Sequence, residues 1–166
     1  MNKGTVLTSA YFFGVVGDPD NLKKIAHHLT DWHVPEHLNK GHLPHKMYTS
    51  IYMVEPLTQA FTNIVERGLV DQVHSYDGSY NNRPKRGNPL TKSLHAGGAA
   101  IDLNAATNQF NKVGDMSTEL IECFTDVGFH SGAFWKKPKD YMHMQLSKDL
   151  FDAQYLRIHG KLPIAA

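Results

Sequence analysis

The segment KSLHAGGAAIDLN, residues 92–104, contains most of the side chains on which an interpretation of this chain depends. Ser93 and His95 stand two residues apart, so on an extended chain they point the same way. The stretch 100–103 alternates like a strand and places Asp102 between apolar neighbours. An unpaired carboxylate is costly to bury. We therefore expect His95 and Asp102 to be two ligands of a metal site.

The middle of this segment has almost no side-chain bulk. Gly97 and Gly98 are followed by two alanines. Glycine allows a close approach of other groups to the backbone. We interpret Gly97-Gly98-Ala99 as room for a metal and its substrate, and we expect a wide pocket here.

Composition narrows the class of protein. The chain has 166 residues and a formal net charge of +1, which suits one ordinary globular domain and gives no basic footprint for nucleic acid. Cys123 is the only cysteine, so an intrachain disulfide and a cysteine-based zinc knuckle are excluded. Eleven histidines make a metal worth considering.

Targeting signals are not evident in the sequence. The apolar residues near the N-terminus are interrupted by Thr8-Ser9 and followed by Asp18, a poor match to a signal peptide. No apolar run approaches the length of a membrane span. We expect synthesis in a cytoplasm without a signal peptide. The oligomeric state is left open.

Apolar periodicity predicts an α+β domain covering residues 1–166, with helices packed on a small antiparallel sheet. Residues 1–43 form a poorly defined N-terminal segment, in which Asp18-Pro19-Asp20-Asn21 predicts a turn followed by the start of a helix. The predicted elements are helices over 56–67, 116–127 and 149–158, strands over 70–76, 100–103 and 141–146, a turn at Asp77-Gly78 and a loop over 81–89. Scattered histidines are interpreted as surface or loop residues: His27, His28, His33, His37 and His42.

His143 is the natural third ligand, because it lies on the polar face of the strand over 141–146, with Met142, Met144 and Leu146 toward the core. Two histidines and one carboxylate that leave a coordination position open are typical of catalytic zinc. Asp140, three residues earlier, could take a proton from an attacking water and pass it to a leaving amine. Arg83 or Arg86 could stabilise negative charge on a carbonyl oxygen.

Each of these residues alone has an ordinary structural explanation. His95 could be a hydrogen-bonded core histidine, Asp102 could cap a turn, and Asp140 could pair with a neighbouring lysine. The combination of the two motifs favours a site.

Taken together, Ser93-x-His95-x-x-Gly98-x-Ala100-x-Asp102 and Asp140-x-x-His143 resemble a family of zinc peptidases that comprises D-alanyl-D-alanine carboxypeptidases and L-alanyl-D-glutamate endopeptidases. The segment 77–87, with Asp77-Gly78-Ser79-Tyr80 and Arg83, resembles the bacterial and phage branch of that family. The resemblance implies a fold similar to hedgehog and D,D-peptidase domains and one catalytic Zn²⁺. It implies these roles: His95, Asp102 and His143 as zinc ligands, Asp140 as general base, Arg83 (with Arg86 as the alternative) polarising the substrate carbonyl, Ser93 supporting the site by hydrogen bonding, and Trp135 walling the cleft.

By the same resemblance the substrate is the stem peptide of bacterial peptidoglycan. The favoured activity is that of an L-alanyl-D-glutamate endopeptidase, a phage or bacterial lytic enzyme that reaches the cell wall after release, with a holin as partner, or as a virion component. One alternative is a D-alanyl-D-alanine carboxypeptidase, for which Arg86 or Lys92 could hold the terminal carboxylate, whereas an endopeptidase needs an open-ended groove. The other alternative is a non-catalytic, zinc-stabilised structural or binding module of a virion.

Overall fold

Two central strands, β6 (Ala100–Leu103) and β8 (Asp140–Leu146), organise a four-stranded antiparallel sheet in the computed structural model, which describes residues 1–164. The outer strands are β3 (Tyr76–Gly78) beside β6 and β7 (Phe129–Gly132) beside β8. The α+β class is confirmed. None of the helices in residues 1–164 is long and apolar enough to cross a membrane.

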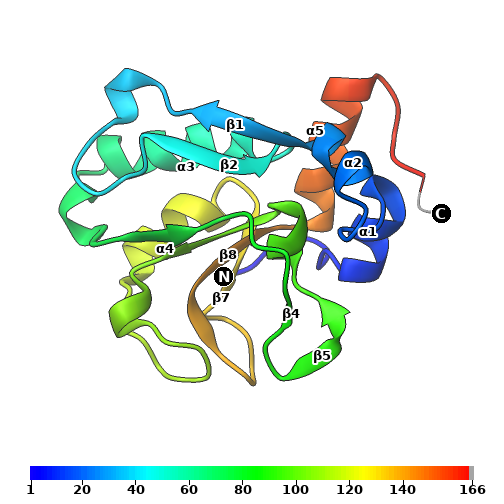
Figure 1. The fold of residues 1–166 in the computed structure, drawn as a ribbon. Coiled ribbons are helices and arrows are strands. Elements are labelled where there is room, and N and C mark those ends of the chain that lie inside the picture. The colour runs from blue at the N-terminus through cyan, green and yellow to red at the C-terminus, as the bar shows by residue number, and fades with distance from the viewer. Residues whose placement is uncertain (165–166) are drawn as a thin grey trace.

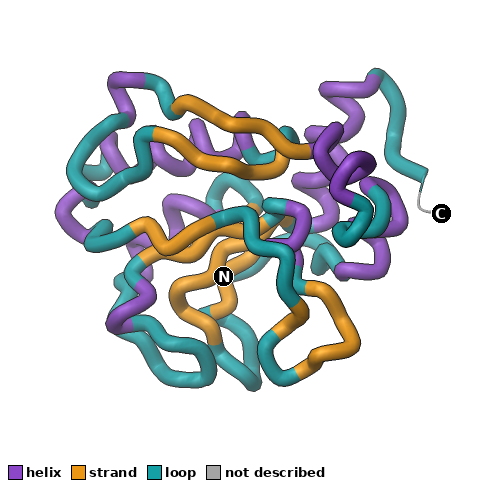
Figure 2. Tube along the Cα trace, viewed as in Figure 1, coloured by secondary structure: helices purple, strands orange, loops and turns teal. Residues whose placement is uncertain are grey.

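The remaining elements surround this sheet (Figures 1 and 2). A β1–β2 hairpin lies along one side with α3, while α1, α2 and α5 gather at one end and a β4–β5 hairpin projects from the sheet. Their bounds are α1 Ser9–Val16, α2 Leu22–Ile25, β1 Leu29–His33, β2 Lys46–Ser50, α3 Val54–Glu66, β4 Pro84–Lys85, β5 Asn88–Lys92, α4 Thr118–Thr125 and α5 Lys148–His159.

The three predicted helices are confirmed, with ends that shift by one to two residues. In α3, Leu57, Phe61 and Ile64 are fully buried at helical spacing, and Phe61 stacks on Trp32 of β1 with ring centroids 6.1 Å apart. Helix α4 begins after Ser117, whose hydroxyl caps it by accepting a hydrogen bond from the Leu120 amide. The strands predicted over 100–103 and 141–146 are also confirmed.

The N-terminal segment contains elements that the sequence pattern did not predict. Helix α1 is apolar nearly all round, so its sequence lacks the polar face of a surface helix. Strand β1 pairs with β2 in register, Leu29 opposite Ser50, yet only Leu29 and Trp32 of its side chains are buried. Of the histidines expected at the surface, His28 is half-buried and hydrogen-bonded to Tyr52, and the other four are exposed.

The prediction of a strand over 70–76 is wrong. Residues Val70–Gln72 form a 3₁₀ turn, and β3 starts only at Tyr76, so Asp77-Gly78 belongs to a strand and not to a turn. The cause is the side chain of Asn104, which accepts from the backbone amides of residues 74 and 75 and donates to the carbonyl of Gln72. These are the backbone groups that a strand would have paired.

The loop predicted over 81–89 is correct only in part. Pro84–Lys85 pairs with β5 in a short hairpin, and Gly87, with φ of +79°, makes the turn. Residues 85–88 of this hairpin line the cleft described below.

Candidate active site

The structure brings the three predicted metal ligands together. Asp102 and His143 are directly opposite each other on β6 and β8. His95 lies on a 3₁₀ turn, Leu94–Gly97, that leads into β6. The Nε2 atom of His95 is 3.2 Å from Asp102 Oδ1 and 3.2 Å from His143 Nδ1, and the last two atoms are 3.3 Å apart.

Hydrogen bonding fixes which ring atoms face one another. The Nδ1 of His95 donates to the carbonyl oxygen of Ser79 at 2.7 Å, and the Nε2 of His143 donates to Gln145 Oε1 at 3.0 Å. In the neutral rings the two nitrogens that converge on Asp102 are therefore unprotonated. Three buried acceptors then point at one another with no hydrogen between them, and a cation would satisfy all three.

The spacing of these atoms also fits a metal ion. Ligand atoms about 2.0–2.1 Å from a tetrahedral zinc ion lie about 3.3–3.4 Å from each other. The observed separations are 3.2–3.3 Å. The buried His95, Asp102 and His143 group could bind a metal ion, and among residues 1–164 it is the only group of three such side chains close enough to do so.

Burial and mutual charge shift the acidities of this cluster. Burial works against the charge of Asp102, but the adjacent imidazoles of His143 and His95 hold the pKa of its carboxyl well below the usual value. Burial likewise works against a charged His143, but Asp102 and Asp140 raise the pKa of its imidazole. In the metal-free protein a proton can therefore occupy the place of a cation, so protons and metal compete.

Ser93 supports His95 through the backbone, and the two residues do not lie on an extended chain as expected. The chain turns at Ser93, whose hydroxyl accepts the backbone N–H of His95 at 3.2 Å and caps the 3₁₀ turn. The expectation that Ser93 and His95 point the same way from an extended strand is wrong. The serine positions the histidine through its backbone.

Gly97-Gly98-Ala99 does not widen the pocket. A Cβ atom on Gly97 would lie 2.4 Å from the Phe12 ring, and one on Gly98 would lie 2.6 Å from the backbone nitrogen of Ser50. Ala99 is fully buried. The small residues allow α1 and β2 to pack against the turn that holds His95, so the interpretation of this stretch as substrate space is wrong.

Asp140 starts β8 and is buried, and its Oδ1 has no hydrogen-bond partner among residues 1–164. The β7–β8 pairing skips several residues here, with Gly132 opposite Asp140 and Ser131 opposite Met144. A Cβ atom on Gly132 would lie 2.3 Å from the Asp140 carbonyl oxygen, so glycine permits this irregularity. Burial raises the pKa of the Asp140 carboxyl, although His143 and Arg86 work in the other direction.

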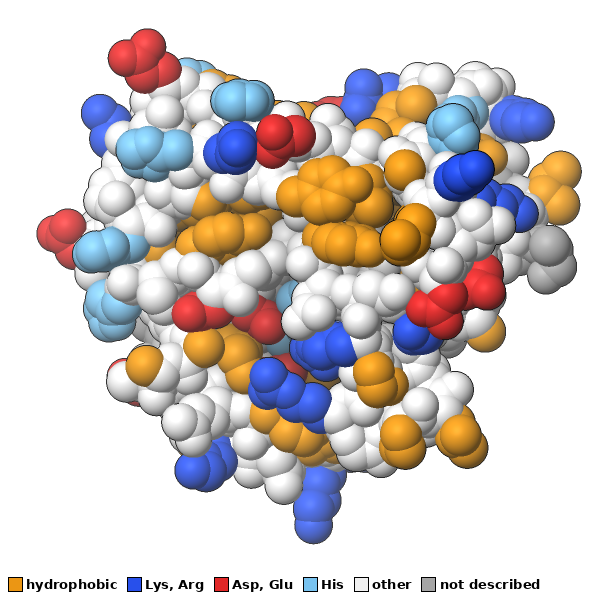
Figure 3. Space-filling view, in the orientation of Figure 1, with side chains coloured by type: hydrophobic (Ala, Val, Ile, Leu, Met, Phe, Trp, Pro, Cys, Tyr) orange, Lys and Arg blue, Asp and Glu red, His pale blue; other side chains and the backbone are white. Residues whose placement is uncertain are grey.

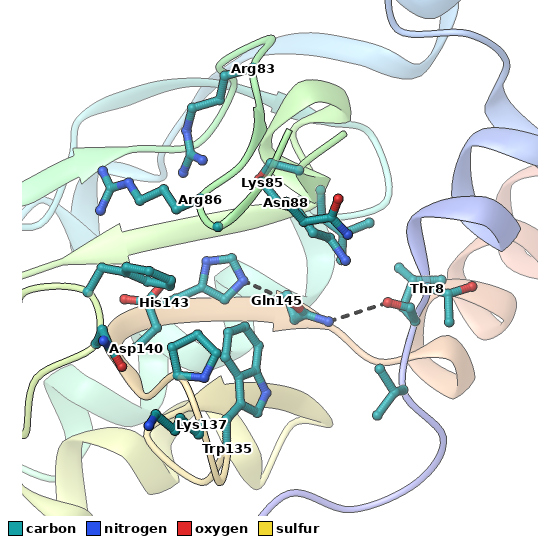
Figure 4. Close-up of a pocket in the computed structure, with 18 residues that line it drawn as sticks. Thr8, Arg83, Lys85, Arg86, Asn88, Trp135, Lys137, Asp140, His143 and Gln145 are labelled. Carbon is teal, nitrogen blue, oxygen red and sulfur yellow. Dashed lines mark hydrogen bonds between the residues drawn. The ribbon is translucent and has the colours of Figure 1, made fainter. Parts of the chain in front are cut away.

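A cleft of about 660 Å³ opens over Asp140 and His143 (Figure 4). Trp135 lies against His143 with ring centroids 5.3 Å apart, so it walls the cleft as the resemblance implies. A second cavity of about 570 Å³ reaches Asp102. Arg86 and Phe110 line both cavities, and the guanidinium carbon of Arg86 is 5.9 Å from the Phe110 ring centroid.

Both candidate arginines line the larger cavity (Figure 4). Burial and the neighbouring Arg86 lower the pKa of Arg83, while the charges of Asp102 and Asp140 favour its cationic form. Lys92 lines neither cavity, and its Nζ is 2.8 Å from the Asp20 carboxylate.

Three parts of the site were not predicted as such. Gln145 fixes the ring of His143, and its Nε2 lies 3.5 Å from the Leu7 carbonyl (Figure 4). Ser79 contributes a backbone carbonyl that no side-chain pattern reveals. Residues 6–8 of the N-terminal segment line the cleft. The alternation of His143 and Gln145 along β8 was the only available signal, since it places both side chains on one face.

Comparison with known proteins agrees with this geometry. Residues 86–146 match the family model described as D-alanyl-D-alanine carboxypeptidase. The match spans all three candidate ligands and Asp140, and it begins beyond Arg83. It supports a zinc peptidase activity for this chain and leaves the branch of the family open. No curated protein and no solved structure matches the chain.

Proposed function

We propose that this protein is a zinc peptidase that hydrolyses peptide bonds in peptidoglycan stem peptides, most specifically as an L-alanyl-D-glutamate endopeptidase. The observation that carries the proposal is the set of three converging buried acceptors beside an unpartnered acid, Asp140, in a cleft. A site that serves only to hold the fold has no need of such an acid, which argues against a non-catalytic virion module.

The roles of the residues follow from their positions. A zinc ion held by His95, Asp102 and His143 would supply the Lewis acidity that activates water and polarises a carbonyl. Asp140 accepts a proton from the attacking water and delivers it to the leaving amine. Its burial and raised pKa suit a group that must hold that proton between the two steps. Arg83, or Arg86 in its place, stabilises the negative charge that develops on the carbonyl oxygen.

Endopeptidase action is favoured over carboxypeptidase action by the shape of the groove. His143 lines the larger cavity and Asp102 lines the second, so two members of the ligand group face different cavities. Arg86 and Phe110 line both cavities. In the proposed reaction the substrate occupies both cavities and extends in both directions from the scissile bond. A lytic enzyme of this kind would reach the wall after release from the cell, through a holin, or as part of a virion.

The experiment is digestion of purified murein and of a defined stem pentapeptide with native protein and with Asp140→Asn. Mass spectrometry of the products identifies the bond. Native protein alone is expected to hydrolyse the L-Ala–D-Glu bond, which gives L-alanine and a tetrapeptide with D-Glu at its N-terminus from the pentapeptide. Loss of a single terminal D-alanine would contradict endopeptidase activity and identify a carboxypeptidase. The absence of any cleavage by zinc-loaded native protein would contradict both activities.

A further inference from the structure

Positive charge is concentrated around the larger cavity. Four cationic side chains line it, Arg83, Lys85, Arg86 and Lys137, whereas Asp140 is the only carboxylate among its lining residues. The whole chain has a net charge of only +1, so this concentration does not reflect a basic protein. In Figure 3, Lys and Arg side chains gather beside the hollow below the centre of the face.

These four cations lack a paired carboxylate in the part of the chain that the structure describes. Among residues 1–164, none of the four makes an ion pair, although five lysine and arginine side chains elsewhere do. Lys139, in the same loop as Lys137, donates instead to the carbonyls of Ala133 and Trp135. With four cations and one carboxylate in its lining, the cleft has an excess of positive charge.

The two lysines come from opposite walls. Lys85 belongs to the β4–β5 hairpin, and Lys137 belongs to the loop before β8, with the strand that bears His143 and Gln145 between them (Figure 4). Arg83, or Arg86 in its place, has the role of stabilising the carbonyl oxygen in the proposed reaction. Lys85 and Lys137 have no such role, and both are exposed enough to meet a ligand.

We infer that Lys85 and Lys137 bind carboxylates of the substrate on either side of the cleft, so that the protein selects acidic peptides and discriminates against their amidated forms. This inference rests on the proposed function, because it names the charge of the peptide that the same cleft takes. Charged groups across a rim favour ligands of complementary charge and repel those of like charge. The carboxylate can belong to a side branch of the peptide or to its C-terminus.

The test measures binding, so that it does not depend on hydrolysis. The parent protein is Asp140→Asn with one equivalent of zinc. The probe is the tripeptide L-Ala-γ-D-Glu-L-Lys in three forms: free acid, amide at the internal α-carboxyl group, and amide at the C-terminus. Dissociation constants are measured by calorimetry for the parent and for its Lys85→Gln/Lys137→Gln derivative. A Lys23→Gln/Lys136→Gln derivative is the control, because it removes the same charge from exposed positions outside the cleft.

The parent is expected to bind the free acid more tightly than at least one amide by about 5-fold, the ratio that corresponds to about 1 kcal/mol for one exposed ion pair. The amide that loses affinity identifies the carboxylate. The Lys85→Gln/Lys137→Gln protein should lose this preference, the control should keep it, and 0.5 M salt should weaken it.

Equal affinity of the parent for all three peptides, no binding of the free acid, or an equal loss of preference in the control overturns the inference. A native protein that cleaves stem peptides but shows no preference refutes this inference alone. A preference without cleavage by the native protein refutes the proposed function alone.

Discussion

The Nε2 atom of His95 lies 3.2 Å from Oδ1 of Asp102, in a buried position where, with the imidazole neutral, neither atom has a hydrogen to share. His143 adds a third acceptor at the same spacing. Burying acceptors against one another without a donor is unfavourable. The fold tolerates the arrangement because a cation can satisfy all three acceptors, so a bound cation should stabilise the folded state.

Removal of metal should destabilise the protein. Zinc at a free concentration 1,000 times its Kd stabilises the folded state by about 4 kcal/mol. For a domain of this size, chelation is then expected to lower the Tm by roughly 8–16 °C, as measured by calorimetry. His143→Ala is the control, since the chelator should leave the Tm of this variant unchanged. An identical Tm for native protein with and without chelator would count against a metal at this site.

Gln145→Leu should weaken zinc binding. The substitution keeps the size of the side chain and removes the oxygen that accepts from His143 Nε2 at 3.0 Å, so the ring is no longer held in the required tautomer. Loss of such an orienting partner typically reduces metal affinity by about 10- to 100-fold. Competition with a chromophoric chelator measures the change. Gln145→Glu retains an acceptor and should stay close to native affinity, so equal losses in both variants would refute the orienting role.

Gly98→Ala should cost more stability than Gly87→Ala. Both glycines have positive φ, +66° and +79°, and a residue with a Cβ atom in that region costs roughly 1–2 kcal/mol. At Gly98 the new Cβ would also lie 2.6 Å from the Ser50 backbone nitrogen, whereas at Gly87 it meets nothing within 4 Å. Urea denaturation gives both free energies of unfolding. Equal costs would show that the turn bearing His95 is not packed tightly on β2.

Acidification should reduce stability through His28. Its Nδ1 is 2.8 Å from the Tyr52 hydroxyl, which also bonds His159. Burial, followed by the nearby charges of His159, His27 and Lys24, lowers the pKa of His28 below 6.5. A lowered folded-state pKa means that the unfolded chain binds the proton first. The associated stability is therefore complete above about pH 6.5 and is lost as the pH falls through the folded-state pKa.

Thermal melting at pH 7.5 and pH 5.5 measures this effect. The Tm of native protein should fall more between pH 7.5 and pH 5.5 than the Tm of His28→Gln does. His37→Gln is the control at an exposed position, and its Tm should change as that of native protein does. If His28→Gln retains the full pH dependence, the cluster around Tyr52 is not its source.

Local patterns were sufficient to predict the three long helices and the two central strands. Apolar residues recur at helical spacing in α3, and the serine cap of α4 is visible in the sequence. The two motifs, with His95 and Asp102 in the first and His143 in the second, predicted the three side chains that lie together. The helices and strands were predictable because their periodicity lies within one element.

Non-local contacts account for what could not be predicted. Strand β1 has only two buried side chains to mark it. The segment before β3 is irregular because a distant side chain, Asn104, forms hydrogen bonds with its backbone groups. Gly98 looked like space for a substrate, since nothing in the sequence shows that β2 packs against it. The carbonyl of Ser79 and the approach of Leu7 to Gln145 likewise depend on tertiary structure.

Titration of metal-free protein with zinc, followed by hydrolysis of a defined stem peptide, tests the central claim most directly. Activity should rise in proportion to added zinc and stop at one equivalent per chain. Asp140→Asn should bind that zinc and lose roughly 100- to 10,000-fold in rate, the usual share of a general base. His143→Ala should fail to bind zinc at the same concentration. Full activity in the chelated native protein, or unchanged zinc affinity in His143→Ala, would contradict the account.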